Sequence, residues 1–287
     1  MSDEHSPSKY TNRLPAHQAL EEFLRVLTEK SKLAREKYRV VQNIQYGDSD
    51  RQVVDIYYPD KVESETEVVF FFHGGYWQEG NPEMYGLTAI PVAQSGKICV
   101  VVGTDLTPHV SFSTILEQCR KAICHFANFF PLTSKITISG HSSGGHLCAM
   151  LLSTDWSVFG KDISSYLERT LRKAVLICGI FELQHLKETR ENENLKLTTE
   201  EAIKNSPISA HNIKTLKENI SNFGCELVLV CVENDAPTIL QWNDAYLKEL
   251  KSNNVHVTYK LLNGLDHFNV IQNITDPASA LAQIIVQ

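Results

Sequence analysis

The sequence has little that would direct it to a nucleic acid, a membrane or an oxidising compartment. Its 287 residues include 34 acidic and 27 basic side chains, a net charge of −7, so no basic excess attracts phosphates or anionic lipids. No apolar run reaches the roughly 18 residues that span a bilayer. The polar start, MSDEHSPSKYTNRLPAH, lacks the apolar region of a signal peptide. We therefore expect a cytosolic protein with no nucleic-acid or membrane partner.

Paired cysteine motifs and metal-binding histidine motifs are also missing. The seven cysteines form no CxxC pair, and most lie inside apolar runs such as ICVVV, VLICG and LVLVCV. An odd number of cysteines in such runs is typical of buried free thiols in a reducing compartment, not of a disulfide framework. The histidines have no HExxH or comparable spacing. We therefore expect no metal and no other cofactor.

What the sequence does contain is an alternation of strand and helix patterns. Continuous apolar runs suit strands that are covered on both faces of a parallel sheet; these runs are VVFFFHGG, ICVVVGTD, KITISGH, KAVLICGI and ELVLVCVEND. Helical patterns lie between them, at about 85–95, 113–128, 144–153, 239–251 and 278–286. The alternation predicts an α/β fold with a mostly parallel central sheet flanked by helices.

The chain is predicted to form one domain with an arm and an insertion. Residues 1–15 are interpreted as a flexible N-terminal arm, and residues 16–287 as a single α/β domain. The domain begins with a helical pattern at about 16–37. One face of that helix carries Leu20, Phe23, Leu24 and Leu27. The charged, helix-prone stretch at about 185–222 is interpreted as a cap or a small helical insertion over the sheet.

A serine lies in a tight turn between a predicted strand and a predicted helix. Residues 140–144 read GHSSG, which fits the pattern G-x-S-x-G, after the strand ITIS and before the helix GHLCAMLL. Side chains at Gly140 or Gly144 would strike the neighbouring strand or helix. Such a turn lifts the hydroxyl of Ser142 clear of the sheet as a nucleophile. It also puts the amide of Ser143 at a helix N-terminus, where negative charge is favoured.

An upstream glycine pair provides a second part of the same chemistry. The run VVFFFHGGYW ends a predicted strand in His73, Gly74 and Gly75, where lipases and esterases carry an HGGG-type oxyanion loop. We assign the amides of Gly74 and Gly75, with that of Ser143, to an oxyanion hole. His73 precedes the serine, against the order Ser…Asp…His of these hydrolases, so we interpret it as a loop-shaping residue.

That chain order directs the search for an acid and a base to the segments after the serine. Asp235 stands just past the strand ELVLVCVEN, and His267 lies in a loop after the last apolar strand. In open α/β sheets the reactive groups gather at the carboxyl ends of the strands. We therefore predict that His267 takes the proton of Ser142 and that Asp235 orients the imidazole.

Other residues compete for these two roles. Glu233 also lies at the end of a predicted strand and is the main alternative acid. Asp244 lies in a predicted helix, and we interpret it as a solvent-exposed side chain. Asp266 adjoins the predicted base, and neighbouring side chains in a loop usually diverge. His141 and His146 flank the serine, and we interpret both as packing and hydrogen-bonding residues of the turn.

The motifs HGGYW, GHSSGGHL, END…P and DHF together resemble one group, the kynurenine formamidases or arylformamidases of the α/β-hydrolase superfamily. The resemblance covers about residues 46–284 in motif order and spacing. It implies an α/β-hydrolase fold and the hydrolysis of N-formyl-L-kynurenine to formate and L-kynurenine in tryptophan catabolism. The family's triad would correspond to Ser142, Asp235 and His267, with a formyl-enzyme intermediate. Many relatives have alanine after the nucleophile, and Ser143 is a small replacement that should preserve the oxyanion hole.

The implied substrate directs attention to the aromatic residues after the oxyanion loop. Tyr76 and Trp77 are expected to form an aromatic wall against the aniline ring of the substrate, with ordinary core or lid packing as the alternative. The resemblance also implies a homodimer. A broad-specificity carboxylesterase on the same fold remains an alternative, because the pocket decides the substrate. A hydrolase-fold binding protein without catalysis is a further alternative.

Overall fold

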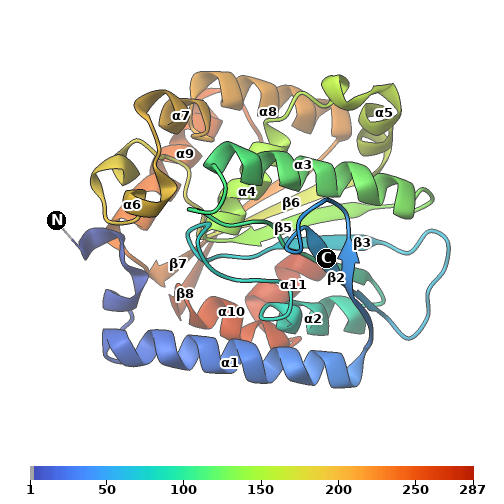
Figure 1. Cartoon of the computed structure of the whole chain (residues 1–287), viewed down its shortest axis with the longest axis horizontal. Coiled ribbons are helices and arrows are strands. Elements are labelled where there is room, and N and C mark those ends of the chain that lie inside the picture. Colours follow the sequence, from blue (N-terminus) through green and yellow to red (C-terminus); the bar gives the residue numbers. More distant parts are fainter. Residues whose placement is uncertain (1–2) are drawn as a thin grey trace.

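The computed structural model describes residues 3–287, and a central sheet organises them (Figure 1). The described strands are β1 (Arg39–Gln45), β2 (Val53–Tyr58), β3 (Val68–Phe72), β4 (Ile98–Val102), β5 (Ile136–His141), β6 (Leu171–Ile177), β7 (Glu226–Asn234) and β8 (Thr258–Asp266). They are ordered β1-β2-β4-β3-β5-β6-β7-β8. The pairings from β4 through β8 are parallel, while β1 and β2 add an antiparallel edge. This arrangement confirms the mostly parallel sheet expected from the apolar runs.

The strands in the middle of the sheet are buried along their whole length. Each residue of β3 is buried, and Phe70 pairs with Val100 of β4 on one side and Ile138 of β5 on the other. Side chains alternate between the two faces of a strand, so both faces of β3 need a cover of helices. The parallel register also brings the carboxyl ends of β3 and β5 side by side, and these ends carry the glycine pair and the serine.

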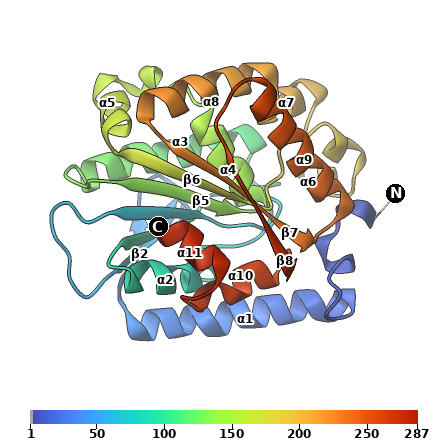
Figure 2. The ribbon, with the colours of Figure 1, turned by 180° about the vertical axis from the view of Figure 1, so that it is seen from behind.

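Helices cover both faces of the sheet, as Figures 1 and 2 show from opposite sides. One face carries α3 (Phe112–Phe129), α4 (Ser143–Leu152), α8 (Ala210–Phe223) and α9 (Pro237–Ser252), with α5 (Lys161–Thr170) against α8. The other face carries α2 (Ala89–Gln94), α10 (Asn269–Gln272) and α11 (Ala280–Val286). Beyond them lies α1 (Ala16–Lys37), the helix predicted at 16–37. Among residues 3–287, no helix is both long and apolar enough to cross a bilayer.

The N-terminal arm packs against the domain, whereas a loose arm was expected. Its described part contains two short 3-10 helices, η1 (Asp3–His5) and η2 (Pro7–Lys9), and Pro7 and Thr11 are buried. Figure 1 shows it running from the side of α6 (Asn192–Leu195) down to the start of α1. Composition concealed this packing, because the arm is held by hydrogen bonds to distant segments and by a few scattered contacts, such as those of Tyr10 and Leu14 with the core.

The insertion predicted at 185–222 divides into two parts. Its second part is most of α8, which packs on α4 and α5 as a regular helix of the outer layer. The first part contains η5 (His185–Glu188), α6 (Asn192–Leu195) and α7 (Thr199–Lys204). In that part, Arg190, Glu191, Glu193 and Asn194 border the cavity at the carboxyl ends of the strands. We call residues 185–206 the cap segment.

Candidate active site

Ser142 occupies the sharp turn between β5 and α4. Its backbone has φ 57° and ψ −119°, and its amide donates to the carbonyl of Ile177 on β6 at 2.8 Å. A Cβ on Gly140 would collide with the carbonyl of Gly144, and one on Gly144 with the carbonyl of Phe72 on β3. The two glycines are therefore required by the close approach of α4 to the sheet, as the sequence indicated.

His267 and Asp235 meet although they are 32 residues apart. The Nδ1 of His267 lies 2.8 Å from Oδ2 of Asp235, and the two side chains are only 5% and 1% exposed. The other carboxylate oxygen accepts the amide of Ala236 at 2.7 Å. An ionised carboxylate can only accept, so Nδ1 carries the proton and the lone pair of Nε2 is left to act as a base.

The competing carboxylates point elsewhere. Glu233 is exposed and accepts the backbone amide of Gly264 at 2.8 Å. Asp244 is exposed on α9 and pairs with Lys248 one turn away. Neither side chain contacts the imidazole, so the geometry favours Asp235 as its partner.

The serine and the histidine border one cavity of about 570 Å³. Its lining also includes Gly74 and Gly75 after β3. Among the hydrogen bonds of residues 3–287, none joins the hydroxyl of Ser142 to His267, and both residues border the same cavity.

The glycine pair supplies backbone donors to this cavity. Gly75 has φ +116°, and a Cβ there would lie 2.5 Å from the carbonyl of Glu79, so the loop needs glycine. Among the described residues, no backbone carbonyl accepts the amides of Gly75 or Ser143, whereas the amide of Gly74 faces the hydroxyl of Tyr85. Unpartnered amides beside a nucleophile are suited to receive a developing oxyanion.

Three histidines around the site are buried and hold loops in place. His141 bonds the backbone carbonyl of His267 through Nε2 at 2.9 Å, and His146 bonds that of Asn205 at 2.8 Å. The Nδ1 of His73 reaches the next carbonyl in the chain at 2.8 Å. Burial lowers the pKa of His73 and of His146 to about 4, and burial followed by the nearby His267 lowers that of His141 well below 6.5. These rings are therefore neutral at pH 7.

The two aromatic residues after the oxyanion loop have different environments. Tyr76 borders the cavity, and its hydroxyl donates to the carbonyl of His5 at 2.6 Å. Trp77 is only 3% exposed and packs edge-on against Phe112 and His146, each with ring centres 4.9 Å away. Trp77 does not border the cavity and packs in the core, which corresponds to the second of the two alternatives stated for it. Both residues have positive φ, so the chain reverses direction between them.

Several residues that the sequence did not single out also line the cavity. Leu20 and Leu24 of α1 are 44% and 37% exposed and border it, while Phe23 and Leu27 of the same face are largely buried. The sequence placed these leucines on one face of the helix but gave them no part in the site. Residues 6–8 of the arm form another part of the wall.

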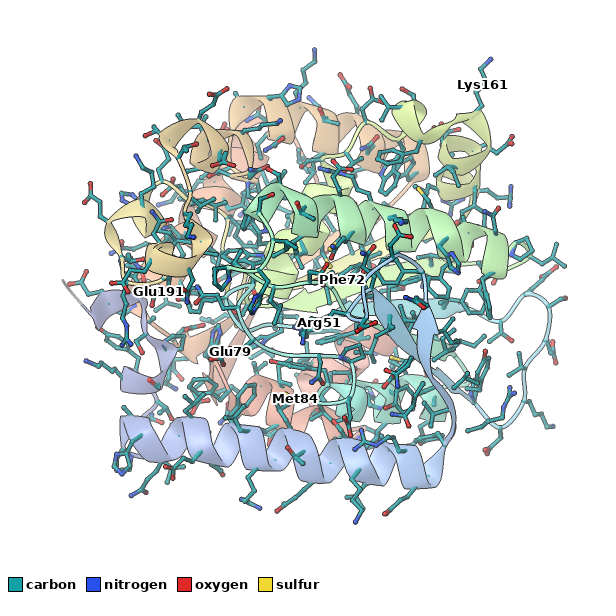
Figure 3. All side chains as sticks on the ribbon, viewed as in Figure 1. Arg51, Phe72, Glu79, Met84, Lys161 and Glu191 are labelled. Carbon is teal, nitrogen blue, oxygen red and sulfur yellow. The ribbon has the colours of Figure 1, made fainter. Side chains whose placement is uncertain are left out.

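The cap segment contributes charge to the rim of the cavity. Its Arg190, Glu191 and Glu193 line the cavity together with Glu79 of the loop after β3. Figure 3 labels Glu191 on the cap, Met84 above α1 and Glu79 between them. A polar rim above a partly apolar floor suits a ligand with an apolar ring and a charged tail.

One group in the described chain brings metal-type ligand atoms together. The ligand atoms of His141, Cys178 and His267 lie within 4.8 Å of one another, and all three residues are buried. Burial, followed by the charge of Asp235, raises the pKa of the Cys178 thiol well above its ordinary value. A metal binds the thiolate and not the thiol, and His267 already bonds Asp235, so this group is poorly suited to a metal.

Comparison with known proteins agrees with the fold and the motifs. Residues 54–223 match the BD-FAE family model. Over 283 residues the chain is 31% identical to the kynurenine formamidase of Salmo salar, covering 98% of this chain and 93% of that protein. It is 29% identical over 284 residues to the kynurenine formamidase of Danio rerio, covering 99% and 94%.

Solved structures share the architecture at lower identity. A thioesterase candidate from Silicibacter sp. superposes with a TM-score of 0.81 at 23% identity, covering 100% of this chain and 98% of that one. At this identity the likeness concerns the fold alone.

Proposed function

The chain belongs to the kynurenine formamidase family of α/β-hydrolases, and we propose that it converts N-formyl-L-kynurenine and water to L-kynurenine and formate. Membership of this family makes it an amide hydrolase. The observation that carries the proposed triad is the 2.8 Å hydrogen bond between His267 and Asp235 at the cavity that Ser142 borders.

The first half of the proposed reaction is acylation of the serine. Ser142 Oγ attacks the formyl carbon while Nε2 of His267 removes its proton. The tetrahedral oxyanion is stabilised by the amides of Gly74, Gly75 and Ser143. His267 then gives the proton to the aniline nitrogen, the C–N bond breaks, and L-kynurenine leaves a formyl ester on Ser142.

The second half restores the enzyme with water. His267 removes a proton from a water molecule as its oxygen attacks the formyl ester, and the same amides receive the second oxyanion. The ester bond then breaks, Ser142 regains its proton from His267, and formate leaves. Asp235 keeps the imidazole oriented and stabilises its positive charge in both halves.

The cavity is compatible with an aryl group that carries an amino-acid tail. Leu20, Leu24 and Tyr76 offer apolar and aromatic surface for the ring. Arg190 is the only lysine or arginine among the lining residues, so we assign it to the carboxylate of the substrate. Glu191 beside it is assigned to the α-ammonium group.

The proposal is tested by comparing substrates on one preparation. The kcat/KM for N-formyl-L-kynurenine should exceed that for p-nitrophenyl acetate, and Ser142→Ala should abolish formate release. A strong preference for the ester would favour the carboxylesterase. Absence of turnover with both substrates would favour a non-catalytic binding protein.

A further inference from the structure

The N-terminal arm contacts the neighbours of two separate active-site loops. The carbonyl of His5 accepts the hydroxyl of Tyr76, the residue directly after the oxyanion glycines, at 2.6 Å. The amide side chain of Asn12 donates to Asn234, the residue directly before the proposed acid, at 3.4 Å. The arm therefore touches the loop after β3 and the last residue of β7, each next to a residue of the proposed chemistry.

The arm makes its strongest contacts with the loop that carries the base. Asp266 directly precedes His267, and its Oδ2 accepts Oγ1 of Thr11 at 2.6 Å and Nε of Arg13 at 2.7 Å. A second guanidinium nitrogen lies 3.5 Å from Oδ1. These bonds span 255 and 253 residues of sequence.

The same carboxylate holds the backbone on both sides of the imidazole. Oδ1 of Asp266 accepts the amides of Phe268 at 2.9 Å and Asn269 at 2.8 Å, and the amide of Asp266 donates to the side chain of Asn269 at 2.7 Å. His267 therefore sits inside a turn whose two ends are joined through Asp266. A displacement of the Asp266 carboxylate therefore also displaces the backbone of His267.

Breaking the ion pair between Arg13 and Asp266 is expected to cost free energy. The side chain of Asp266 is 2% exposed and that of Arg13 is 30% exposed. Removing Arg13 leaves the buried carboxylate with neutral donors but without its charged partner, and breaking such a pair destabilises its surroundings more than breaking a surface ion pair would. When the pair is broken, the turn around His267 is expected to change its conformation.

We propose that Arg13 is a positioning residue, which through Asp266 holds the turn of His267 so that its imidazole meets Ser142. The arm thereby connects the loops of the oxyanion donors, the acid and the base. This inference rests on the proposed roles of Ser142 and His267. It adds that residues 3–13, which precede the domain in sequence, set the geometry of its reaction.

The test compares Arg13→Ala with Arg13→Lys, Thr11→Val and the control Arg25→Ala. Arg25 also makes an ion pair, with Glu29 at 2.6 Å, but both side chains are 58% exposed on α1. For each variant we would measure kcat and KM for N-formyl-L-kynurenine, the rate of Ser142 labelling by a fluorophosphonate, and Tm. The labelling rate depends on the serine and its base but not on the identity of the natural substrate.

Arg13→Ala is expected to lower kcat and the labelling rate about tenfold or more, since displacements of about 1 Å can cost 10²-fold, with KM changed less than about twofold. Arg13→Lys should recover part of both rates, Thr11→Val should lower them less, and Arg25→Ala should leave them unchanged. Unchanged kcat and labelling in folded Arg13→Ala, or a rise in KM alone, would overturn the inference. If Arg13→Ala does not fold, the same criteria apply to Thr11→Val.

The two proposals fail in different ways. If the native protein is labelled at Ser142 but does not hydrolyse the formamide, the substrate is wrong and the labelling rates still test Arg13. If the formamide is hydrolysed and Arg13→Ala keeps its kcat, the positioning role is wrong and the function stands.

Discussion

At the scale of the residue, the site depends on a few backbone and side-chain contacts that leave little freedom. The turn at Ser142 requires glycine on both sides, because α4 passes close to β3 and β5. His267 is oriented by a carboxylate that is almost fully buried. Substitutions that exchange a single side-chain atom at such positions, such as Asp to Asn, should change the reaction rate without changing the fold.

The carboxylate of Asp235 offers the sharpest such change. Asp235→Asn keeps the size of the side chain but favours the wrong tautomer of His267, so kcat should fall by about 10³- to 10⁴-fold while the circular dichroism spectrum is retained. Glu233→Gln is the matched control and should leave kcat unchanged. A larger loss in Glu233→Gln than in Asp235→Asn would transfer the role of acid to Glu233.

The guanidinium of Arg190 should act on binding of the substrate tail. Arg190→Gln is expected to raise KM for N-formyl-L-kynurenine about tenfold or more, since a hydrogen bond between charged groups contributes about 1.5–3 kcal/mol. Formanilide lacks the amino-acid tail, so its KM should not change in the same variant. Equal effects on both substrates would remove Arg190 from tail recognition.

At the scale of the element, α1 has two roles. Its residues Phe23 and Leu27 are buried in the core and border the cavity from there, while Leu20 and Leu24 border it with a large part of their surface exposed. A helix of this length can bridge both environments because successive turns of one face meet different neighbours. The sequence pattern alone cannot separate a leucine that meets the core from one that meets a ligand.

This division predicts different effects for two leucines of α1. Leu24→Ala should raise KM for N-formyl-L-kynurenine about fivefold, because a bound ring would bury part of a leucine worth about 1–2 kcal/mol, and it should change Tm little. Leu33→Ala, at a position that is 56% exposed and does not line the cavity, should change neither. Equal KM values for both variants and the native protein would place the ring elsewhere.

At the scale of the whole molecule, the two ends of the chain are joined at the active site. Thr11 and Arg13 near the start of the chain form hydrogen bonds with Asp266 near its end. Helix α1 lies beside α10, which follows Asp266 in sequence. The docking of the N-terminal arm and the geometry of the site are therefore linked through the carboxylate of Asp266. Acid should weaken this link.

The expected pH dependence follows from the pKa of Asp266. Burial would raise that pKa, but the hydrogen bonds from Arg13, Asn269 and Thr11 outweigh it and hold it below the ordinary value of 3.8. Its contribution to stability is thus fully present above about pH 4 and is lost as the pH falls through the lowered pKa. The charged neighbour of Asp266 is Arg13, which also pairs with Glu22.

The measurement is the free energy of unfolding of the native protein and of Asp266→Asn between pH 7 and pH 3. The difference between them should be constant from pH 7 to about pH 5 and should shrink below about pH 4. Glu22→Gln serves as a control, because Glu22 also pairs with Arg13 but its side chain is 30% exposed, against 2% for Asp266. A difference that grows toward acid would contradict the lowered pKa.

The sequence by itself determined the parts that depend on local pattern. Apolar runs predicted the buried strands, glycines at 140 and 144 predicted the turn at the serine, and strand ends located Asp235 and His267. Each of these inferences needs only neighbours along the chain or the rule that parallel strands deliver their carboxyl ends to one edge.

The tertiary structure alone decided the contacts between distant segments. It assigned Trp77 to the core and Tyr76 to the cavity, exposed Leu24 to the ligand space, and joined Arg13 to Asp266 across 253 residues. None of these has a local signature, because a side chain's partner depends on which segment the fold brings against it. The polar arm looked unstructured for this reason: its bonding partners lie at the far end of the chain.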